Sequence, residues 1–405
     1  MKKYALAIIG GGFSGLCLAN LLCENLKNDC VIFEKLDRVG KKLLSTGNGR
    51  GNFSNKNLNV AFYHGEDPAF VKTAIEKYDN EVIEGFFAKF GIPSAVEDGK
   101  VYPESLQSNA LLDALRLSIG HIKLRLNEEV RKIEKQGGAF AVTTKAGVYY
   151  FENVALCAGG KAAKNFGTDG SAYALARGLG HSVTELFPSI VQIKVDTERT
   201  KGLKGVKRPA EVSLYDGENL IARKFGDALF SDGYLSGNTA FYLSSYAHGL
   251  KKPFLSVDLV PNISETAAFD CLFKRKKDFP EENSTFLLSG IVHTAVAVKI
   301  AKGLFNNKKL KDLDANDLKK AIYELKNYKM DVLGTGSFDN AQVTRGGIRT
   351  SEIDDKTLMS KLCENLYFCG EIIDVDGDCG GYNLHWAFAS ASAVAEHLNE
   401  KYYNR

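Results

Sequence analysis

The hydrophobic pattern at the start of the chain predicts one strand–helix–strand unit. An uninterrupted apolar run over residues 4–9 is typical of a fully buried strand, and residues 16–26 have the composition of a helix. A second apolar run over 30–33 predicts a neighbouring strand. Because all three segments follow one another within about 30 residues, they predict a βαβ unit with a parallel sheet.

A glycine motif joins the first strand to the helix. It reads Gly10-Gly11-Gly12-Phe13-Ser14-Gly15 and fits G-x-G-x-x-G. Its first glycine permits a sharp turn, its second lets a pyrophosphate approach the backbone, and its third lets the helix lie close to the sheet. The helix start offers free N–H groups to phosphates. Glu34 ends the second strand where an acid is expected to bind a ribose hydroxyl, so the unit predicts a dinucleotide site.

The pattern changes to period two from residue 129. Segments 129–134, 139–144 and 148–151 predict three short antiparallel strands, and 153–157 predicts a buried strand ending in Ala158-Gly159-Gly160. A β-meander that returns to the parallel sheet is typical of one branch of flavoproteins, and the glycines let a cofactor meet the backbone there. Upstream, 36–52 predicts an extended loop, whereas 67–91 and 105–118 have helical periodicity.

The middle of the chain predicts an insertion. Residues 188–260 are rich in strands and turns, and 265–278, 292–305 and 314–326 are helical in pattern. Strands return at 341–348 and 366–371, followed by a helix over 384–398. We therefore predict an α/β fold: a Rossmann-like domain of parallel sheet plus three-stranded β-meander, with inserted β-barrel-like and small helical domains. Its segments are 1–187 and 346–405 for the Rossmann-like domain, 188–262 plus 329–345 for the barrel, and 263–328 for the helices.

The C-terminal segment, combined with the N-terminal motif, indicates a flavin site rather than a purely structural glycine turn before a capped helix. Glu371 follows a late strand, where a carboxylate can bind the hydroxyls of a ribityl chain. Gly380-Gly381 precedes the last helix, and backbone N–H groups there can reach the pyrimidine edge of an isoalloxazine. The positive end of that helix stabilises the negative charge that develops on flavin reduction.

Composition narrows the class of protein. The chain has 405 residues, 44% of them hydrophobic and 25% charged, with a formal net charge of +3. This length predicts more than one domain, and the near-neutral charge does not favour nucleic acid as a partner. Eight scattered cysteines without a C-x-x-C pair suit a reducing compartment and predict no metal site. With no signal peptide and no apolar run of 18 residues, we expect a cytoplasmic protein without a membrane span.

Several longer blocks resemble a known family. GGGFSG, VIFEK, GKKLLSTGNGRGNFSN, VALCAGG, VTRGGIRTSEID, SKLCENLYFCGEIIDVDG and GGYNLHWAFASA together closely resemble the YhiN/BaiN-like flavoproteins, in the right order over nearly the whole chain. The resemblance implies an FAD-binding domain of the glutathione-reductase type with a β-barrel and a helical insert. Family members include reductases of conjugated steroid ketones and aminoacetone oxidases.

The resemblance also implies which residues hold FAD. The pyrophosphate is expected at the glycine motif, the adenosine at Glu34, Lys35 and the Val130 backbone, and the flavin at the loop from Lys42 to Gly49 and at the C-terminal segment. The full set is Gly10, Gly12, Phe13, Ser14, Gly15, Glu34, Lys35, Lys42, Ser45, Thr46, Gly47, Asn48, Gly49, Val130, Ala158, Gly159, Gly160, Gly370, Glu371, Asp374, Gly381, Tyr382, Asn383 and Leu384.

Departures from the family lie in loops expected to face the substrate. Gly51 stands where the family usually has cysteine, and His385 stands where it often has glutamine. The stretches 162–165 and 231–238 also differ from the family pattern. The substrate of a relative therefore does not transfer directly to this chain.

FAD would supply hydride transfer between its N5 atom and a small organic substrate. The candidates for an assisting proton donor or acceptor are His385, Tyr382, Arg50 and Tyr234, and none is assigned as catalytic. The chain has one G-x-G-x-x-G, so NADH or NADPH either visits the flavin transiently or is not the electron donor at all. Three hypotheses stay open: NAD(P)H-dependent reduction of an activated C=C, oxidation of an amine with formation of peroxide, and a flavoprotein that binds a macromolecule such as RNA.

Overall fold

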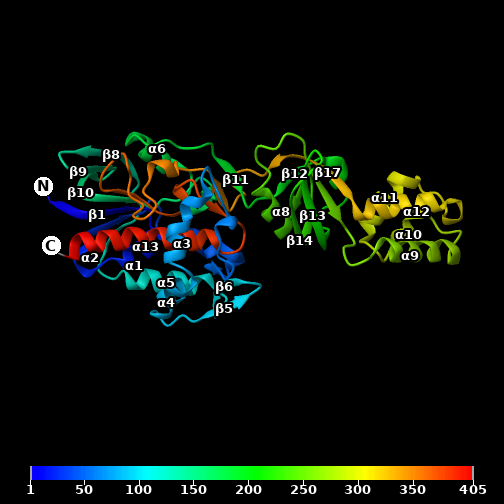
Figure 1. The fold of residues 1–405 in the computed structure, drawn as a ribbon, viewed down its shortest axis with the longest axis horizontal. Helices are drawn as coiled ribbons and strands as arrows, with labels where there is room; N and C mark the ends of the chain where they lie inside the picture. The colour runs from blue at the N-terminus through cyan, green and yellow to red at the C-terminus, as the bar shows by residue number, and fades with distance from the viewer. Residues whose placement is uncertain (1, 404–405) are drawn as a thin grey trace. The chain divides into compact units, whose positions relative to one another are not determined.

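The computed structural model describes residues 2–403, so positions 1 and 404–405 of the predicted domain segments lie outside the described residues. The chain forms two compact units. One consists of the segment up to Pro188 together with the segment from Phe338 onwards, and the other is Ser189–Ser337 (Figure 1). Each unit has its own hydrophobic core.

The first unit is built on a mixed sheet whose strand order is β7-β2-β1-β10-β9-β8, with β19 also paired to β10. Pairing is parallel from β7 through β10 and for β19, and antiparallel between β10, β9 and β8. This confirms the predicted parallel sheet with its β-meander. The strands are β1 (Lys3–Ile9), β2 (Cys30–Phe33), β7 (Lys123–Arg125), β8 (Val130–Gln136), β9 (Ala139–Thr144), β10 (Gly147–Leu156) and β19 (Leu366–Phe368).

Strand β10 differs from the prediction of two separate strands over 148–151 and 153–157. It runs unbroken because its neighbour on one edge changes along its length. Its first half pairs with β9 as far as Phe151, and its second half pairs with β19 from Val154. The meander thus gives way to the C-terminal strand at the centre of the sheet.

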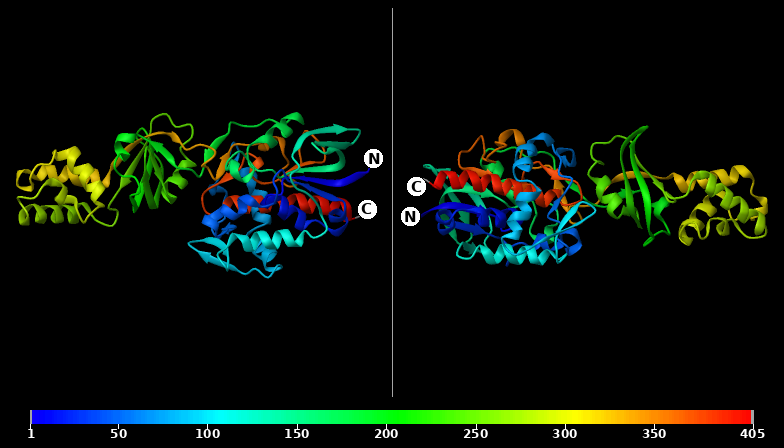
Figure 2. Two further views of the ribbon diagram at one scale, coloured as in Figure 1. Left: turned by 180° about the vertical axis from the view of Figure 1, so that it is seen from behind. Right: turned by 60° about the horizontal axis from the view of Figure 1, so that its bottom comes forward.

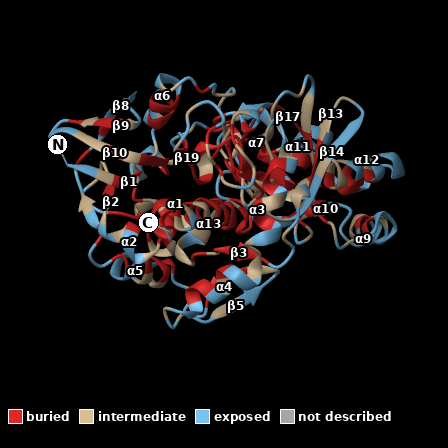
Figure 3. Ribbon diagram, turned by 60° about the vertical axis from the view of Figure 1, so that its left-hand side comes forward, coloured by how far each residue is buried: buried red, intermediate tan, exposed pale blue. Residues whose placement is uncertain are grey.

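A short N-terminal helix and the long C-terminal helix pack together against the sheet. Helix α1 (Phe13–Leu21) lies beside α13 (Tyr382–Tyr403), which brings the two ends of the chain into contact (Figure 2). Both helices are largely buried (Figure 3). Helix α5 (Ser108–Ser118) contacts α1, and α6 (Ser171–Gly178) contacts β8. The remaining helices of this unit are α2 (Glu24–Asn28), α3 (Lys72–Lys77) and α4 (Asn80–Ala88).

The predicted helix over 16–26 is broken into α1 and α2. Leu22 has an extended backbone, with φ −67° and ψ 146°. The side chain of Asn399 on α13 accepts a hydrogen bond from the Cys23 N–H and donates one to the Leu21 carbonyl. This tertiary contact satisfies the backbone groups that the break exposes, a cause that local sequence does not contain.

The loop predicted over 36–52 is more regular than expected. Residues Lys41–Gly49 form 3-10 turns, here labelled η1, with a kink at Thr46–Asn48. Further short strands form three small sheets. Strands β3 (Ser54–Asn55), β5 (Ser94–Glu97) and β6 (Lys100–Pro103) form one, β4 (Tyr63–His64) pairs with β20 (Asp376–Gly377), and β11 (Phe187–Ser189) pairs with β18 (Val343–Arg345). Further 3-10 turns are Val60–Phe62, Pro68–Val71, Lys164–Phe166, Thr350–Glu352 and η7 (Gly370–Ile372).

The second unit combines a closed barrel with a helical group. The barrel order is β12-β15-β14-β13-β16-β17, and its inward residues, such as Val212 and Leu214, are fully buried. One continuous apolar core joins barrel and helices. The elements are β12 (Ile193–Val195), α7 (Thr197–Thr200), β13 (Lys207–Asp216), β14 (Asn219–Ser231), β15 (Tyr234–Ser236), α8 (Asn238–Ser244), β16 (Pro253–Asp258), α9 (Glu265–Asp278), α10 (Ser284–Leu288), α11 (Thr294–Phe305), η5 (Leu310–Asp312), α12 (Ala315–Lys326) and β17 (Tyr328–Thr335).

The boundary at the end of the insertion differs from the prediction, which placed 329–345 in the barrel. The last barrel strand ends at Thr335, and residues from Phe338 belong to the first unit. The Phe338 carbonyl accepts a hydrogen bond from the Ala163 N–H, and β18 pairs with β11 rather than with the barrel. The strand predicted at 341–348 is present as β18 (Val343–Arg345), but its local sequence could not identify its partner.

Candidate cofactor site

The predicted glycine motif forms a tight turn at the carboxyl end of β1. Gly10 has φ +106°, and a Cβ there would lie 2.6 Å from the Cys157 carbonyl oxygen, so only glycine fits without movement. Gly12 precedes the first turn of α1, in which Phe13, Ser14 and Gly15 follow. The turn therefore places bare backbone and a helix N-terminus at the carboxyl end of β1, where a phosphate can bind.

Glu34 closes against this turn, as the motif requires. Its carboxylate accepts hydrogen bonds from the Gly11 N–H at 3.0 Å and the Leu36 N–H at 2.9 Å. Burial raises the pKa of the Glu34 carboxyl, while these two N–H groups oppose the rise. A polar acceptor is thus fixed beside the glycine turn, where a ribose hydroxyl would lie.

A cavity of about 370 Å³ opens beyond Glu34. Lys35 lines it and pairs with Asp169 at 2.7 Å. Burial alone would raise the pKa of Asp169, but hydrogen bonds from Lys35 and Ser171 lower it to about 2. Val130 opens β8 between two lining residues, and the cavity walls are Lys35, Leu36, Asn127, Glu129, Arg131, Lys145, Lys164, Gly167 and Asp169.

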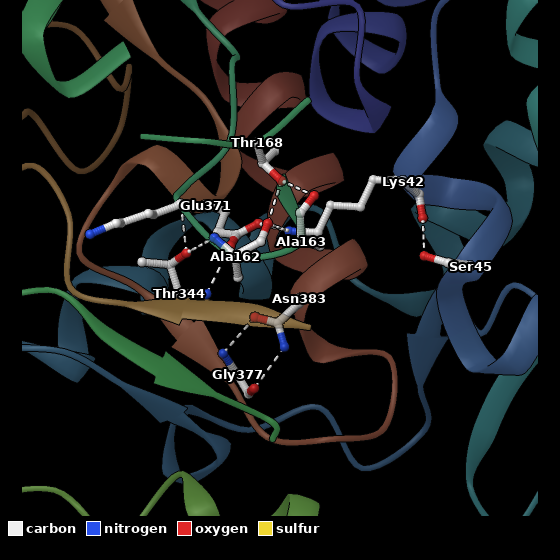
Figure 4. A network of polar contacts seen from close by, with 10 residues as sticks. Lys42, Ser45, Ala162, Ala163, Thr168, Thr344, Glu371, Gly377 and Asn383 are labelled. Atoms are coloured by element: carbon white, nitrogen blue, oxygen red, sulfur yellow. Dashed lines mark hydrogen bonds and ion pairs between the residues drawn. The ribbon is translucent and has the colours of Figure 1, made fainter. Parts of the chain in front are cut away.

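A polar network lies over the ends of β10 and β19 (Figure 4). Lys42 Nζ pairs with Glu371 Oε2 at 2.7 Å, and the other carboxylate oxygen accepts the Thr344 N–H at 2.8 Å. Thr344 Oγ1 in turn accepts the N–H groups of Lys161 and Ala162. The network ties the loop after β2 to strand β18 (Val343–Arg345) and to the segments that follow β10 and β19.

The other predicted residues of these segments are close by. Gly160 lies against Thr344 and Glu371, because a Cβ on it would come within 3 Å of each side chain. Ala158 lies against Gly10. Gly159 lies between Ala158 and Gly160 in the sequence, just after the end of β10. In η1, the Ser45 and Thr46 hydroxyls donate to the carbonyls of Lys42 and Leu43, and Gly47, Asn48 and Gly49 all have positive φ.

The segment around Gly370 contacts the first turn of α1, and its carboxylates act electrostatically on a buried tyrosine. A Cβ on Gly370 would lie 3.2 Å from Ser14 Oγ, so this segment meets the first turn of α1. Asp374 is buried, and its carboxylate accepts the Glu66 N–H at 3.1 Å; burial raises its pKa. The buried Tyr173 hydroxyl has no hydrogen-bond partner within residues 2–403, and burial together with the charges of Glu371 and Asp374 raises its pKa.

The turn before α13 is the last part of the predicted site. Gly381 has φ +104°, and a Cβ there would lie 2.2 Å from the Ser54 carbonyl oxygen. Asn383 makes paired hydrogen bonds with both backbone groups of Gly377, at 2.8 and 2.7 Å (Figure 4). Tyr382 is buried and stacks on Phe62, and Leu384 is partly buried. The helix N-terminus is therefore held in place by contacts on both sides.

These observations fit an FAD molecule. The glycine turn suits a pyrophosphate, Glu34 and the cavity beside it suit an adenosine, and the carboxylates near Tyr173 suit a chain of hydroxyl groups. The buried Tyr173 hydroxyl, which has no partner in the described part of the chain, is a donor that an additional polar group in this region can satisfy.

The candidate proton donors are less suited to catalysis than their positions in sequence suggested. His385 is fully buried, and its Nδ1 lies 2.8 Å from Ser54 Oγ. Tyr382 directs its hydroxyl at the Asn57 carbonyl. Arg50 stacks on the Tyr102 ring and pairs with Glu97, and Tyr234 lies on barrel strand β15.

The sequence did not single out Thr344 or Tyr173. Thr344 lies in the block VTRGGIRTSEID, which carried the family resemblance without a role for any one residue. Tyr173 lies on a helix with ordinary amphipathic patterning, and no local signal indicates that its hydroxyl is buried and under the electrostatic influence of Glu371.

Comparison with known proteins identifies the family. Residues 4–397 match the HI0933-like protein Rossmann domain, and the chain belongs to this family. It is 33% identical, over 95% of this chain and 96% of the relative, to a 3-dehydro-bile acid delta(4,6)-reductase of Clostridium scindens. It is 25% identical to ribosomal RNA dihydrouridine synthases of Haemophilus influenzae, over 96% of both chains, and of Escherichia coli, over 98% of both chains.

These matches confirm the resemblance stated from the sequence. The protein is an FAD-dependent oxidoreductase with a Rossmann-type nucleotide-binding fold. Among residues 2–403, no helix combines the length and the apolar character needed to cross a membrane.

Proposed function

We propose that this protein uses NADH or NADPH to reduce a carbon–carbon double bond conjugated to a carbonyl group in a small organic substrate. The observation that carries the proposal is the 33% identity, over nearly the full length of both chains, to a reductase named for the delta(4,6) double bonds of a 3-dehydro-bile acid. Because the chain departs from the family pattern at Gly51 and His385, the proposal names this class of substrate and not the particular compound that the relative reduces.

The predicted site residues would bind successive parts of FAD, from the adenosine to the ring system, along the carboxyl ends of the strands. Glu34, Lys35 and Val130 would bind the adenosine, and the segment 10–15 would bind the pyrophosphate through backbone N–H groups. Glu371, with Asp374, Gly370 and segment 158–160, would face the ribityl chain. Residues 42–49 and 381–384 would bind the ring system.

When bound between residues 10–15, 42–49 and 381–384, FAD would supply the two-electron chemistry that links the nicotinamide to the substrate. In the net reaction NAD(P)H and one proton are consumed, and the C=C bond becomes a C–C bond with two new C–H bonds. The protein's part is to fix the cofactor, orient the substrate and exclude water. The turns at Gly10 and Gly381 are suited to fixing the cofactor, because their backbones are packed against the backbones of Cys157 and Ser54.

Anaerobic rapid mixing of the holoprotein with NADH or NADPH tests the proposal. Rapid bleaching of the flavin, followed by reoxidation on adding a conjugated steroid ketone or a simple cyclic enone, is the expected result. Peroxide formed from an amine without any nicotinamide would instead support the oxidase hypothesis. A folded protein that is colourless and does not take up added FAD would contradict both.

A second candidate substrate is a uracil base in ribosomal RNA. Both ribosomal RNA dihydrouridine synthases match this chain along nearly its full length. Conversion of uridine to dihydrouridine also saturates a C=C bond conjugated to a carbonyl, so the flavin chemistry is the same. The unit Ser189–Ser337 holds 23 Lys and Arg against 18 Asp and Glu, a net charge of +5 that the whole-chain value of +3 conceals. A positively charged unit favours a polyanionic partner.

The two candidates separate in one experiment. Holoprotein and NADPH are incubated with free enones in one arm and with ribosomal RNA lacking dihydrouridine in the other. Dihydrouridine measured by mass spectrometry of the digested RNA supports the second candidate. Enone turnover with unchanged RNA supports the first.

A further inference from the structure

An ion pair joins two distant parts of the chain at the cofactor site. Lys42 belongs to η1 near the start of the chain, whereas Glu371 follows β19 near its end. Their side chains meet at 2.7 Å and are 24% and 18% exposed (Figure 4). An ion pair this shielded from water interacts more strongly than a surface pair.

The position of this pair follows from the strand order β2-β1-β10, with β19 on the far side of β10. Glu34 ends β2 and Gly10 ends β1, so they mark the adenosine and pyrophosphate positions. Ligands of open α/β sheets lie along the carboxyl ends of the strands. A dinucleotide that starts at Glu34 and crosses Gly10 must therefore carry its other half over β10 and β19, where Lys42 meets Glu371.

The ion pair is held rigidly from several sides. The second oxygen of Glu371 accepts the Thr344 N–H, and Lys42 Nζ also lies 3.4 Å from the Ala162 carbonyl oxygen. Thr168 donates to the same carbonyl. The positive charge is thus fixed before any ligand binds, and fixed charges stabilise a developing charge without a cost for reorganisation.

We infer that Lys42 is the fixed cation that raises the reduction potential of the bound flavin, and that Glu371 moderates its effect. The inference rests on the proposed function, because it requires FAD. Reduction adds negative charge to the isoalloxazine, and a nearby cation stabilises the reduced form relative to the oxidised form. Neutralising Glu371 leaves the charge of Lys42 uncompensated, so the two residues act in opposite directions.

The test is the two-electron midpoint potential of FAD in the holoprotein, together with the affinity of the flavin for sulfite. Lys42→Met is expected to lower the potential and to weaken sulfite binding about tenfold. Glu371→Gln keeps an acceptor for Thr344 and is expected to raise the potential. Lys42→Arg keeps the charge and should stay near the wild type.

Lys41→Met is the matched control. Lys41 is the neighbouring lysine in the same turn, but its ammonium pairs with Asp37 at 2.5 Å. Its removal should leave the potential unchanged.

Shifts of the same sign in Lys42→Met and Glu371→Gln, or no shift in either while FAD stays bound, overturn the inference and leave the proposed function intact. If Lys42→Met does not retain FAD, the midpoint potentials of Glu371→Gln and Lys42→Arg test the inference instead. An unchanged potential in Glu371→Gln then overturns the inference. Failure of the wild-type protein to bind FAD contradicts the proposed function instead.

Discussion

His385 on α13 and Ser54 on β3 form a buried hydrogen bond, with 2.8 Å between Nδ1 and Oγ. The Ser54 hydroxyl lies 2.5 Å from Asn80 Oδ1 and donates to it, so it accepts the bond from His385. The Ser54 carbonyl faces Gly381, so this bond supports the turn that begins α13. Nε2 of His385 has no hydrogen-bond partner within the described residues.

The protein is expected to lose stability as the pH falls from about 6.5 to about 4. Burial lowers the pKa of His385 to about 4, against weaker opposing effects of the Tyr78 backbone and Asp79. The unfolded chain takes up the proton near pH 6.5, so between about pH 6.5 and 4 it binds more protons than the folded chain. The free energy of unfolding therefore decreases as the pH is lowered through this range. The loss amounts to about 3 kcal/mol at about 1.4 kcal/mol per pKa unit.

Chemical unfolding of wild type and His385→Gln across this pH range measures the effect. The variant should show a smaller loss, whereas His121→Gln, at a half-exposed histidine, should follow the wild type. Equal pH slopes for wild type and His385→Gln would contradict the prediction.

Gly381→Ala should weaken both folding and FAD binding. The added Cβ would lie 2.2 Å from the Ser54 carbonyl at φ +104°, so the turn must move, at a cost of about 1–3 kcal/mol. The matched control is Gly85→Ala in α4, where no atom lies within 4 Å of the added Cβ. Alanine there should stabilise the protein by about 0.5–1 kcal/mol. Thermal unfolding with and without FAD gives both quantities.

Tyr173→Phe should separate FAD binding from folding. The phenol oxygen is buried without a partner in the described chain, so its removal should leave the stability of the apoprotein unchanged or slightly higher. If the hydroxyl serves the bound cofactor, the FAD dissociation constant rises about tenfold, as expected for one lost hydrogen bond. An unchanged FAD affinity in a titration followed by flavin fluorescence would exclude that role.

Thr344→Val should destabilise the first unit by about 1–3 kcal/mol, because the N–H groups of Lys161 and Ala162 lose their acceptor. Thr143→Val on β9 is the control: it makes the same change in composition at a less buried strand position. Denaturant unfolding compares the two. A Thr344→Val protein as stable as the control would show that water replaces the hydroxyl.

The sequence by itself determined the elements whose signals are local. The apolar runs at β1 and β2, the glycine motif and the period-two strands of the meander each depend on neighbouring residues only. The same holds for Glu34, which the motif places and whose carboxylate bonds the Gly11 N–H. The family resemblance reached further: it predicted the FAD-dependent class, which the family match confirmed.

Only the tertiary structure decided which distant segments meet. Asn399 breaks the helix over 16–26 from the far end of the chain, β10 changes its neighbour midway, and β18 joins β11 instead of the barrel. Lys42 and Glu371 are 329 residues apart, and nothing in their local sequence links them. Such contacts arise from packing and buried hydrogen bonding across the whole sheet, and these depend on the folded arrangement rather than on local pattern.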